Sequence, residues 1–342
     1  MNHNWLLYLA IFSSSFGIAI AATPLAKKIS VKAGAIDMPR LRGMHEEPIP
    51  RMGGIAIVLG FLAALGIAAI FMPEVHTLQF LGFVVGALII VAAGIIDDIR
   101  ELKPGMKLAL QIVASLVPIF SGISFDFLKA AFPAILNDSL SIPITLIWIV
   151  GLTNAVNFID GLDGLAAGVS TIAALSLLVL CLITGSGLAV VLAAALAGSC
   201  LGFLPRNFNP AEVIMGDTGS QFLGYVLAVS SILGPFKAYA LLSVVIVSFV
   251  LALPIFDTAF AILRRLWAHK PIYAADRGHL HHRLIDSGYS QKQTVVLLYV
   301  LSAVSGVIAI VIAIQDSRAI IVTSFCVVIM LMMIFIYRKR TH

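Results

Sequence analysis

Acidic and basic side chains that could take part in catalysis stand at the ends of long apolar segments. Asp97 and Asp98 directly follow one such segment, and Lys107 comes after a Pro-Gly step. Two adjacent carboxylates repel each other, so they favour a cation or a proton between them. The pattern predicts an acid pair toward which the turn brings Lys107 back. The alternative is an ordinary acidic helix end.

A second polar cluster ends another apolar segment and consists of Asn154, Asn157, Asp160 and Asp163. Nine residues of helix turn the chain by about 900°, so the first and last of these side chains would lie on opposite faces of an unbroken helix. They can converge only if the chain bends at Gly161, which the Asp-Gly steps permit. Amides in the last turn of a membrane-spanning segment are costly and usually mark function. The alternative is a polar turn capped by an aspartate.

Two further clusters carry groups suited to binding anions. In residues 216–220, small residues surround Asp217 at a helix start, where backbone N–H groups can approach an anion closely. A plain N-cap made by Asp217 or Thr218 is the alternative. The last cluster joins histidines to arginines and contains Arg277, His279, His281, His282 and Arg283. Zinc would need a fourth ligand or an open site, and the arginines disfavour another cation, so we expect an anion-binding loop.

The composition indicates what must position these clusters. Of 342 residues, 60% are hydrophobic and only 11% are charged, against roughly 25% charged in soluble globular proteins. The mean hydropathy is +1.05. These values exclude a disordered chain, a secreted disulfide scaffold and a nucleic-acid-binding module. The three cysteines lie in apolar runs and form neither a disulfide framework nor a metal cluster. We therefore predict an all-α, polytopic integral membrane protein.

Apolar runs long enough to cross a bilayer predict about eleven transmembrane helices. The predicted spans are 5–22, 53–72, 79–96, 107–123, 142–158, 164–184, 187–204, 218–233, 239–257, 294–314 and 318–337. With the N-terminus outside and the C-terminus cytoplasmic, 19 of the 22 Lys and Arg residues fall inside, as expected for a membrane protein. Residues 1–342 are predicted to form a single domain. Its active-site loops would be cytoplasmic and comprise residues 23–52, 97–107, 158–164, 205–218 and 258–293.

All four polar clusters then face the cytoplasm, where a water-soluble phosphorylated reactant could reach them. A lipid could enter from between the helices. Carboxylates able to hold Mg²⁺, together with a lysine and an Arg/His loop, suggest phosphoryl transfer. The main rival is a secondary transporter, which would place ionisable groups near the bilayer midplane at broken helices. The predicted span interiors carry almost no charge.

Together these motifs resemble the polyprenyl-phosphate N-acetylhexosamine-1-phosphate transferase family. The early loop 37–54, with Arg40, His45, Pro48 and Arg51, and the number of spans add to the resemblance. Such proteins transfer a sugar-1-phosphate from a UDP-sugar to a polyprenyl phosphate in the membrane and release UMP. A cytidine-nucleotide phosphotransferase is a further rival, but it would carry an Arg soon after its first Asp-Gly, where this chain has Leu162.

The resemblance implies roles for the metal-side residues. Asp217 would be the ligand of Mg²⁺, for which Mn²⁺ could substitute, and Asn157 would help to hold that ion. Asp97, with Asp98 beside it, would deprotonate or orient the acceptor phosphate. Lys107 would contact the phosphates.

The resemblance also implies roles for the substrate-side residues. Asp163 would recognise uracil, with Asp160 in the same turn and Asn154 also assigned to substrate binding. His279, as a catalytic residue, with Arg277, His281 and His282 would belong to a loop that closes over the pyrophosphate. Some relatives place an aromatic side chain three residues before the metal-binding aspartate, and here that position is Ile214. Base stacking must therefore come from elsewhere or be weaker.

The same loop favours one donor. Relatives that use UDP-MurNAc-pentapeptide carry three consecutive histidines, whereas here Leu280 separates His279 from the other two. The resemblance thus implies transfer of GlcNAc-1-phosphate from UDP-GlcNAc to undecaprenyl phosphate in a bacterial plasma (inner) membrane. This would be the first lipid-linked step of a cell-envelope polysaccharide. UDP-MurNAc-pentapeptide stays the alternative donor, and a homodimer is a further expectation from the family.

Overall fold

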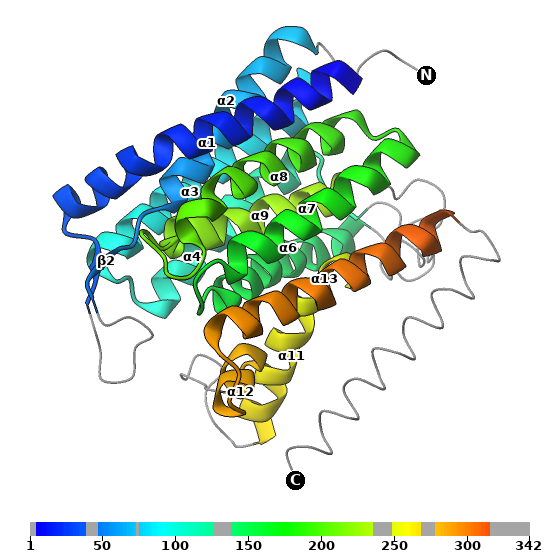
Figure 1. Cartoon of the computed structure of the whole chain (residues 1–342). Coiled ribbons are helices and arrows are strands. Elements are labelled where there is room, and N and C mark those ends of the chain that lie inside the picture. The colour runs from blue at the N-terminus through cyan, green and yellow to red at the C-terminus, as the bar shows by residue number, and fades with distance from the viewer. Residues whose placement is uncertain are drawn as a thin grey trace.

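The computed structural model describes residues 5–38, 47–72, 75–125, 138–234, 248–267 and 278–314. Most of them form long helices that lie side by side (Figure 1). These helices are α1 (Trp5–Ala33), α2 (Gly54–Phe71), α3 (Leu78–Arg100), α4 (Pro104–Phe120), α6 (Asp138–Ile159), α7 (Leu165–Thr184), α8 (Gly187–Asn207), α9 (Gly216–Leu233), α11 (Ala252–Trp267), α12 (Leu280–Asp286) and α13 (Gln291–Ile314). The predicted all-α membrane fold is confirmed at this level.

One small element departs from a purely helical fold. Strands β1 (Ile36–Asp37) and β2 (Ile49–Pro50) pair antiparallel, with Ile36 opposite Pro50. The pair continues into the site, because Ile214 donates its backbone N–H to the carbonyl of Pro50 at 2.9 Å. Ile214 is thus fixed to β2 through its backbone.

Seven of the described helices are long and apolar enough to cross a membrane: α1, α2, α3, α6 from Leu140, α7, α8 and α13. The predicted spans 107–123 and 218–233 correspond to α4, which is shorter, and α9. The predicted span 318–337 lies outside the described residues, and 239–257 lies partly outside them. Eleven spans and the placement of the two termini therefore stay predictions.

Helix α9 forms the centre of the bundle. Almost all of its residues are buried, and it packs against α2, α3, α6, α7 and α8. Glycines permit the closest of these approaches. A Cβ on Gly54 of α2 would collide with the backbone nitrogen of Gly219, and one on Gly94 of α3 would lie 2.5 Å from the Cα of Thr218. Close backbone approach fixes α9, which carries Asp217, relative to α2 and α3.

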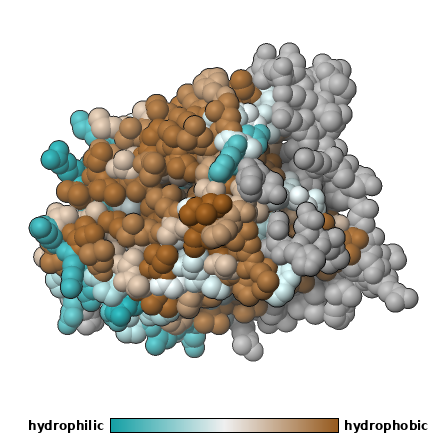
Figure 2. All heavy atoms as spheres, turned by 90° about the horizontal axis from the view of Figure 1, so that it is seen from above, coloured by the Kyte–Doolittle hydropathy of each residue, from teal (hydrophilic) through white to brown (hydrophobic). Residues whose placement is uncertain are grey.

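Apolar side chains cover the flanks of this bundle. Figure 2 shows a hydrophobic surface over most of the described helices, with hydrophilic residues gathered toward one end. Exposed residues on these flanks include Leu9, Leu81, Leu88 and Val113. A surface of this kind suits contact with lipid tails and agrees with a multi-pass membrane protein.

Two helices extend ten or more residues past their predicted ends. Helix α1 continues from the predicted end at residue 22 to Ala33, and α11 continues beyond Asp257 to Trp267. The apolar run indicates where a helix lies in the membrane, but the helix stops only where the backbone changes conformation. For α1 that change comes at Gly34, whose φ is +73°.

Candidate active site

Asp97 and Lys107 meet where the chain turns from α3 into α4. One oxygen of Asp97 accepts a hydrogen bond from the backbone N–H of Leu102 at 2.6 Å. Its other oxygen lies 3.0 Å from Nζ of Lys107 in the first turn of α4. The chain reverses through Glu101, which has a left-handed φ of +45°, and Pro104 then starts α4. The predicted return of Lys107 toward the acids is seen.

Asp98 points away from Lys107 and into the start of α9. Its carboxylate accepts hydrogen bonds from the backbone N–H groups of Asp217 at 2.9 Å and Thr218 at 3.0 Å, and from the hydroxyl of Thr218 at 2.6 Å. The first N–H groups of a helix have no partner within it, and a carboxylate also suits the positive end of the helix dipole. The cap of α9 therefore comes from α3, and not from Asp217 or Thr218 themselves.

Three oxygen-bearing side chains converge on the Lys107 ammonium. Besides Asp97, Nζ contacts Oδ1 of Asp217 and lies 3.4 Å from Oδ1 of Asn157. The Asn157 amide donates to Asp217 at 2.6 Å and to the hydroxyl of Ser220 at 2.7 Å. The last turn of α6 and the first turns of α4 and α9 thus form one polar centre. The side chains of Lys107 and Asp217 remain 19% and 18% exposed, so a ligand can reach them.

Arg51, between β2 and α2, supplies a second cation. Its Nε lies 3.3 Å from Oδ1 of Asp98, and its terminal nitrogens lie 3.7 Å from Asp217 and 3.9 Å from Glu101. The early loop motif contains Arg51, but its sequence context alone predicts no role for this residue at the site.

Buried amides support this polar centre from inside the bundle. Gln111 donates to Oε1 of Gln221 at 2.9 Å and accepts from Asn154 at 2.7 Å. Gln221 lies one turn after Asp217, and its amide is 3.5 Å from that carboxylate. A fully paired network of this kind holds its members rigidly. Asn154, predicted as a substrate-binding residue, lies in this network, about one helical turn further from the end of α6 than Asn157.

The chain bends after α6, as the two Asp-Gly steps predicted. Helix α6 ends at Ile159 and α7 starts at Leu165, so Asp160 and Asp163 lie in the turn between them. Burial and the nearby carboxylates of Asp217, Asp98 and Asp163 raise the pKa of Asp160 to about 8. Asp163 is buried and accepts hydrogen bonds from the Asn209 amide at 3.0 Å and the backbone N–H of Ala211 at 3.1 Å. These contacts anchor the loop between α8 and α9.

The segment that carries His279, His281 and His282, called the histidine loop below, packs beside this turn. Asp257 of α11 lies 2.8 Å from Nδ1 of His279 and accepts from the backbone N–H of Leu280, the first residue of α12, at 2.8 Å. His281 packs directly on Gly161, where a Cβ would lie 2.5 Å from its Nε2. Burial and the adjacent His282 lower the pKa of His281 to about 4. His281 is therefore neutral at pH 7. Arg277 lies outside the described residues.

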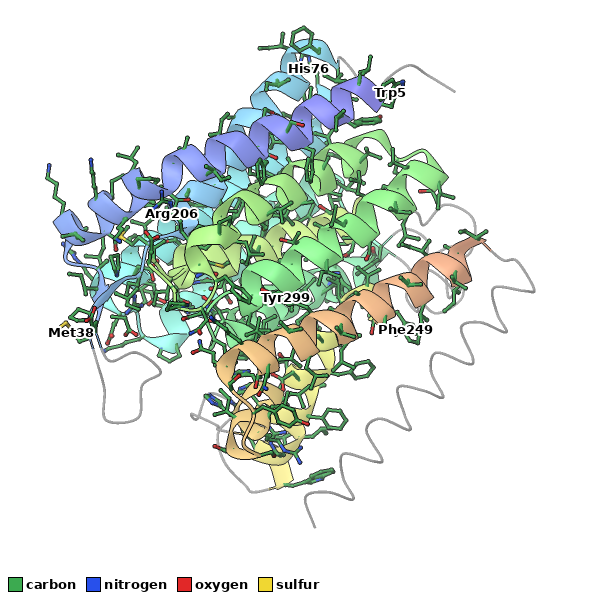
Figure 3. The ribbon with its side chains drawn as sticks, in the orientation of Figure 1. Trp5, Met38, His76, Arg206, Phe249 and Tyr299 are labelled. Carbon is green, nitrogen blue, oxygen red and sulfur yellow. The ribbon has the colours of Figure 1, made fainter. Side chains whose placement is uncertain are left out.

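Helix α13 closes the site at its side. The Tyr299 hydroxyl donates to the carbonyl of Gly164 at the start of α7. In Figure 3, Trp5 and His76 mark one end of the bundle and Met38 and Arg206 the opposite end. The polar centre belongs to the end marked by Met38, since β2 and Arg51 lie there. All described predicted site residues gather at this end.

The sequence of this chain is similar to those of known proteins over most of its length. Residues 80–235 match glycosyl transferase family 4. A protein of Bacillus subtilis (strain 168) named "Probable undecaprenyl-phosphate N-acetylglucosaminyl 1-phosphate transferase" is 39% identical over 316 residues, covering 91% of this chain and 86% of that protein. The chain belongs to glycosyl transferase family 4.

Other members of this family are more distant. "Decaprenyl-phosphate N-acetylglucosaminephosphotransferase" of Mycolicibacterium smegmatis is 37% identical over 309 residues, which are 82% of this chain and 76% of that protein. "Undecaprenyl-phosphate alpha-N-acetylglucosaminyl 1-phosphate transferase" of Escherichia coli (strain K12) is 24% identical over 286 residues, which are 81% and 76% of the two chains. The family resemblance expected from the motifs is confirmed.

The oxygens of the polar centre are of the type that Mg²⁺ prefers as ligands. The oxygens of Asp97, Asn157 and Asp217 already surround one positive charge, the Lys107 ammonium. Within the described residues, no group of three or more His, Cys, Asp or Glu could enclose a metal ion by itself. Mg²⁺ does not need such an enclosure, because it is usually held by one or two carboxylates, waters and substrate phosphates. The donors present therefore fit Mg²⁺ better than Zn²⁺.

Three residues that contact the predicted site residues were not predicted, because only the tertiary structure places them there: Arg51, Gln221 and Asp257. Asp257 and Gln221 had a usable signal, since each is a polar residue inside an otherwise apolar segment, like Asn154 and Asn157. Arg51 had no such sequence signal apart from its place in the early loop motif, because its role depends on how α2, α3 and α9 pack together.

Proposed function

We propose that this protein transfers N-acetylglucosamine-1-phosphate from UDP-GlcNAc to undecaprenyl phosphate and releases UMP. The observation that carries the proposal is the polar centre at the helix ends, where two cations, Lys107 and Arg51, lie among Asp97, Asp98 and Asp217. The printed names of the relatives support a polyprenyl-phosphate acceptor and a GlcNAc-phosphate group.

The acceptor phosphate is already an anion at pH 7, so it needs no strong base. Its oxygen forms a bond to the sugar-bearing phosphorus of the donor while the pyrophosphate bond breaks, and the bridging oxygen leaves with UMP. The main obstacle is the repulsion between an anionic acceptor and an anionic pyrophosphate. Lys107 would offset this charge, and a fixed charge in a partly buried site acts more strongly than in water.

Asp217, Asp97 and Asn157 would hold Mg²⁺, with Mn²⁺ as a substitute. When bound, the ion would supply Lewis-acid stabilisation of the phosphate oxygens. Its ligands would come from the same oxygens that contact Lys107, so the lysine would turn toward the phosphates. The charge of the ammonium would then act on the substrate.

The histidine loop would bind the donor pyrophosphate. Asp257 contacts His279 at Nδ1, so Nε2 would be the nitrogen that binds the pyrophosphate. Asp163 would contribute to uracil recognition, and its contacts with Asn209 and Ala211 would set the shape of that pocket. Asp160, His282 and Arg277 would complete the donor side.

The donor and the location complete the proposal. UDP-GlcNAc is favoured over UDP-MurNAc-pentapeptide by the interrupted histidine run and by the names of the three relatives. UDP-sugars are made in the cytoplasm, and the charge distribution supports a polar centre that faces the cytoplasm from a bacterial plasma membrane. The product, undecaprenyl-diphosphate-GlcNAc, would start a cell-envelope polysaccharide, and the protein would act as a homodimer.

The test is transfer of radiolabel from UDP-GlcNAc to undecaprenyl phosphate by the purified full-length protein. We expect label in the organic phase, an equal amount of UMP, loss of activity in EDTA and recovery with Mg²⁺ or Mn²⁺. UDP-MurNAc-pentapeptide and UDP-GalNAc serve as competing donors. A product from the pentapeptide donor and none from UDP-GlcNAc would refute the assignment.

A further inference from the structure

The start of α9 is held by Asp98 of α3 and by Arg51, which lies just before α2. Asp98 is buried with no exposed side-chain surface, and its two oxygens are engaged by Asp217, Thr218 and Arg51. A carboxylate in this position has no free face toward a substrate phosphate. Its effect on the reaction must therefore pass through α9.

Arg51 links Asp98, which caps α9, to the carboxylate of Asp217, the proposed metal ligand. One guanidinium nitrogen lies 3.3 Å from Asp98 and another lies 3.7 Å from Oδ2 of Asp217. The Oδ1 atom of the same Asp217 carboxylate contacts Asn157 and Lys107. The two oxygens of Asp217 thus have separate partners, and this division fixes the rotation of the carboxylate.

The backbone around Arg51 is fixed as well. Its N–H donates to the hydroxyl of Ser30 at 3.0 Å, and Gly53 and Gly54 donate to the carbonyls of Ile214 and Met215 at 2.9 Å. Gly216 has a left-handed φ of +70°, and a Cβ there would collide with the Arg51 carbonyl. The segment before α2 is thus tied directly to the start of α9.

We propose that Arg51 and Asp98 are positioning residues that form a clamp on the start of α9 and aim the Asp217 carboxylate at the divalent cation. The inference rests on the proposed function for the role of Asp217, and it replaces the catalytic role that the sequence suggested for Asp98. Partners that orient a metal ligand commonly change metal affinity about 10- to 100-fold when they are removed.

Thr218→Val gives the sharpest test, because it keeps the shape of a buried side chain and removes the hydroxyl hydrogen bond to Asp98 but not the one from the backbone N–H. The matched control is Thr171→Val in α7, where the buried hydroxyl bonds only to its own helix at Ala167. Mn²⁺ affinity is measured by electron paramagnetic resonance, and amide hydrogen exchange is followed across residues 215–222. We expect Thr218→Val to weaken Mn²⁺ binding about tenfold and to speed exchange. Thr171→Val should leave both unchanged.

Conservative variants separate positioning from direct catalysis. Asn can still accept a backbone hydrogen bond as an N-cap, so Asp98→Asn should retain much more Mn²⁺ affinity and turnover than Asp98→Ala. Arg51→Gln should lower Mn²⁺ affinity and kcat with little change in the KM for UDP-GlcNAc, and Arg51→Lys should recover part of both. The pH profile of Asp98→Asn should keep the shape of the original.

Other outcomes would overturn the inference. If Asp98→Asn is as inactive as Asp98→Ala while Mn²⁺ binding and exchange stay normal, Asp98 contacts the reacting atoms. If Arg51→Gln raises only the KM, Arg51 binds substrate instead. The clamp would also be refuted if Thr218→Val binds Mn²⁺ as tightly as the original protein. It would equally be refuted if the original protein binds no Mn²⁺. If the original protein binds Mn²⁺ but does not use UDP-GlcNAc, the proposed function fails and the binding and exchange results still decide the clamp.

Discussion

At the scale of single residues, Lys107 has the most contacts with acids of the polar centre among the predicted site residues. It contacts Asp97 and Asp217 and approaches Asn157. Lys107→Met keeps most of the side-chain length and removes the charge. We expect kcat/KM to fall about 10²- to 10³-fold, the range found when one stabilising donor is removed from an active site. Radiolabel transfer at saturating and limiting UDP-GlcNAc measures the loss.

Lys103→Met is the matched control, since Lys103 lies one turn earlier and is exposed. It should change kcat/KM by less than about twofold, because exposed charges are largely screened. Equal losses in both variants would mean that general positive charge, rather than Lys107, supports the reaction.

His281 gives a prediction about pH. Its pKa is about 4 in the docked loop and 6.5 for an ordinary histidine, so the undocked loop takes up a proton more readily. The contribution of His281 to docking is complete above pH 6.5 and is lost as the pH falls toward 4. Amide exchange of residues 279–290, corrected for the intrinsic effect of pH, should therefore accelerate over this range. His281→Phe should flatten the change, and a pH dependence that survives this substitution would exclude His281 as its cause.

Sequence reasoning found the residues of the polar centre but assigned their partners incompletely. Asp97, Lys107, Asn157 and Asp217 could be selected because polar groups at the ends of apolar helices are costly and need a purpose. The division between Asp97, which faces Lys107, and Asp98, which caps α9, depends on how α3 meets α9. No local pattern encodes that contact, so the motif alone predicts the same role for both acids.

At the scale of helices, the contact between α2 and α9 is the one that a single methyl group should disturb most clearly. Gly54→Ala places a Cβ against the backbone of Gly219, which cannot move aside as a flexible side chain could. Overpacking of this kind costs about 1–3 kcal/mol or more, so the apparent Tm in detergent should fall by about 5 °C. Activity should fall too, since α9 carries Asp217.

Gly66→Ala in the same helix is the control. Gly66 is exposed and a Cβ there meets no atom within 4 Å, so the substitution should leave Tm unchanged or slightly raised. A fall in Tm as large as that of Gly54→Ala would show that loss of glycine itself, and not the contact with α9, is responsible.

The helices themselves could be predicted better than their ends. Apolar runs predicted α1 to α4 and α6 to α9 because only a helix satisfies its backbone within a bilayer. They could not show that α11 runs on to Trp267. This helix buries Asp257 and Arg265 on one side and exposes Phe256, Phe260 and Trp267, a mixed pattern that a search for uniformly apolar runs passes over.

At the scale of the whole molecule, the two ends of the bundle differ in charge. The end that carries the polar centre also carries Lys27, Lys28, Arg51, Lys103 and Arg206, and Figure 2 shows hydrophilic residues gathered toward one end. The turn at Thr184, between α7 and α8, belongs to the opposite end of those helices. Since Lys and Arg are retained on the cytoplasmic side, the polar centre should face the cytoplasm.

Cysteine labelling in intact cells tests this orientation. After the native Cys181, Cys200 and Cys326 are replaced by alanine, single cysteines are introduced as Thr184→Cys and Lys28→Cys, both at exposed positions. A membrane-impermeant maleimide should label Thr184→Cys in whole cells and Lys28→Cys only after permeabilisation. Retained transfer activity shows that each variant is folded. The reverse labelling pattern would put the polar centre outside, where no UDP-sugar is supplied, and would contradict both the orientation and the donor proposed for this protein.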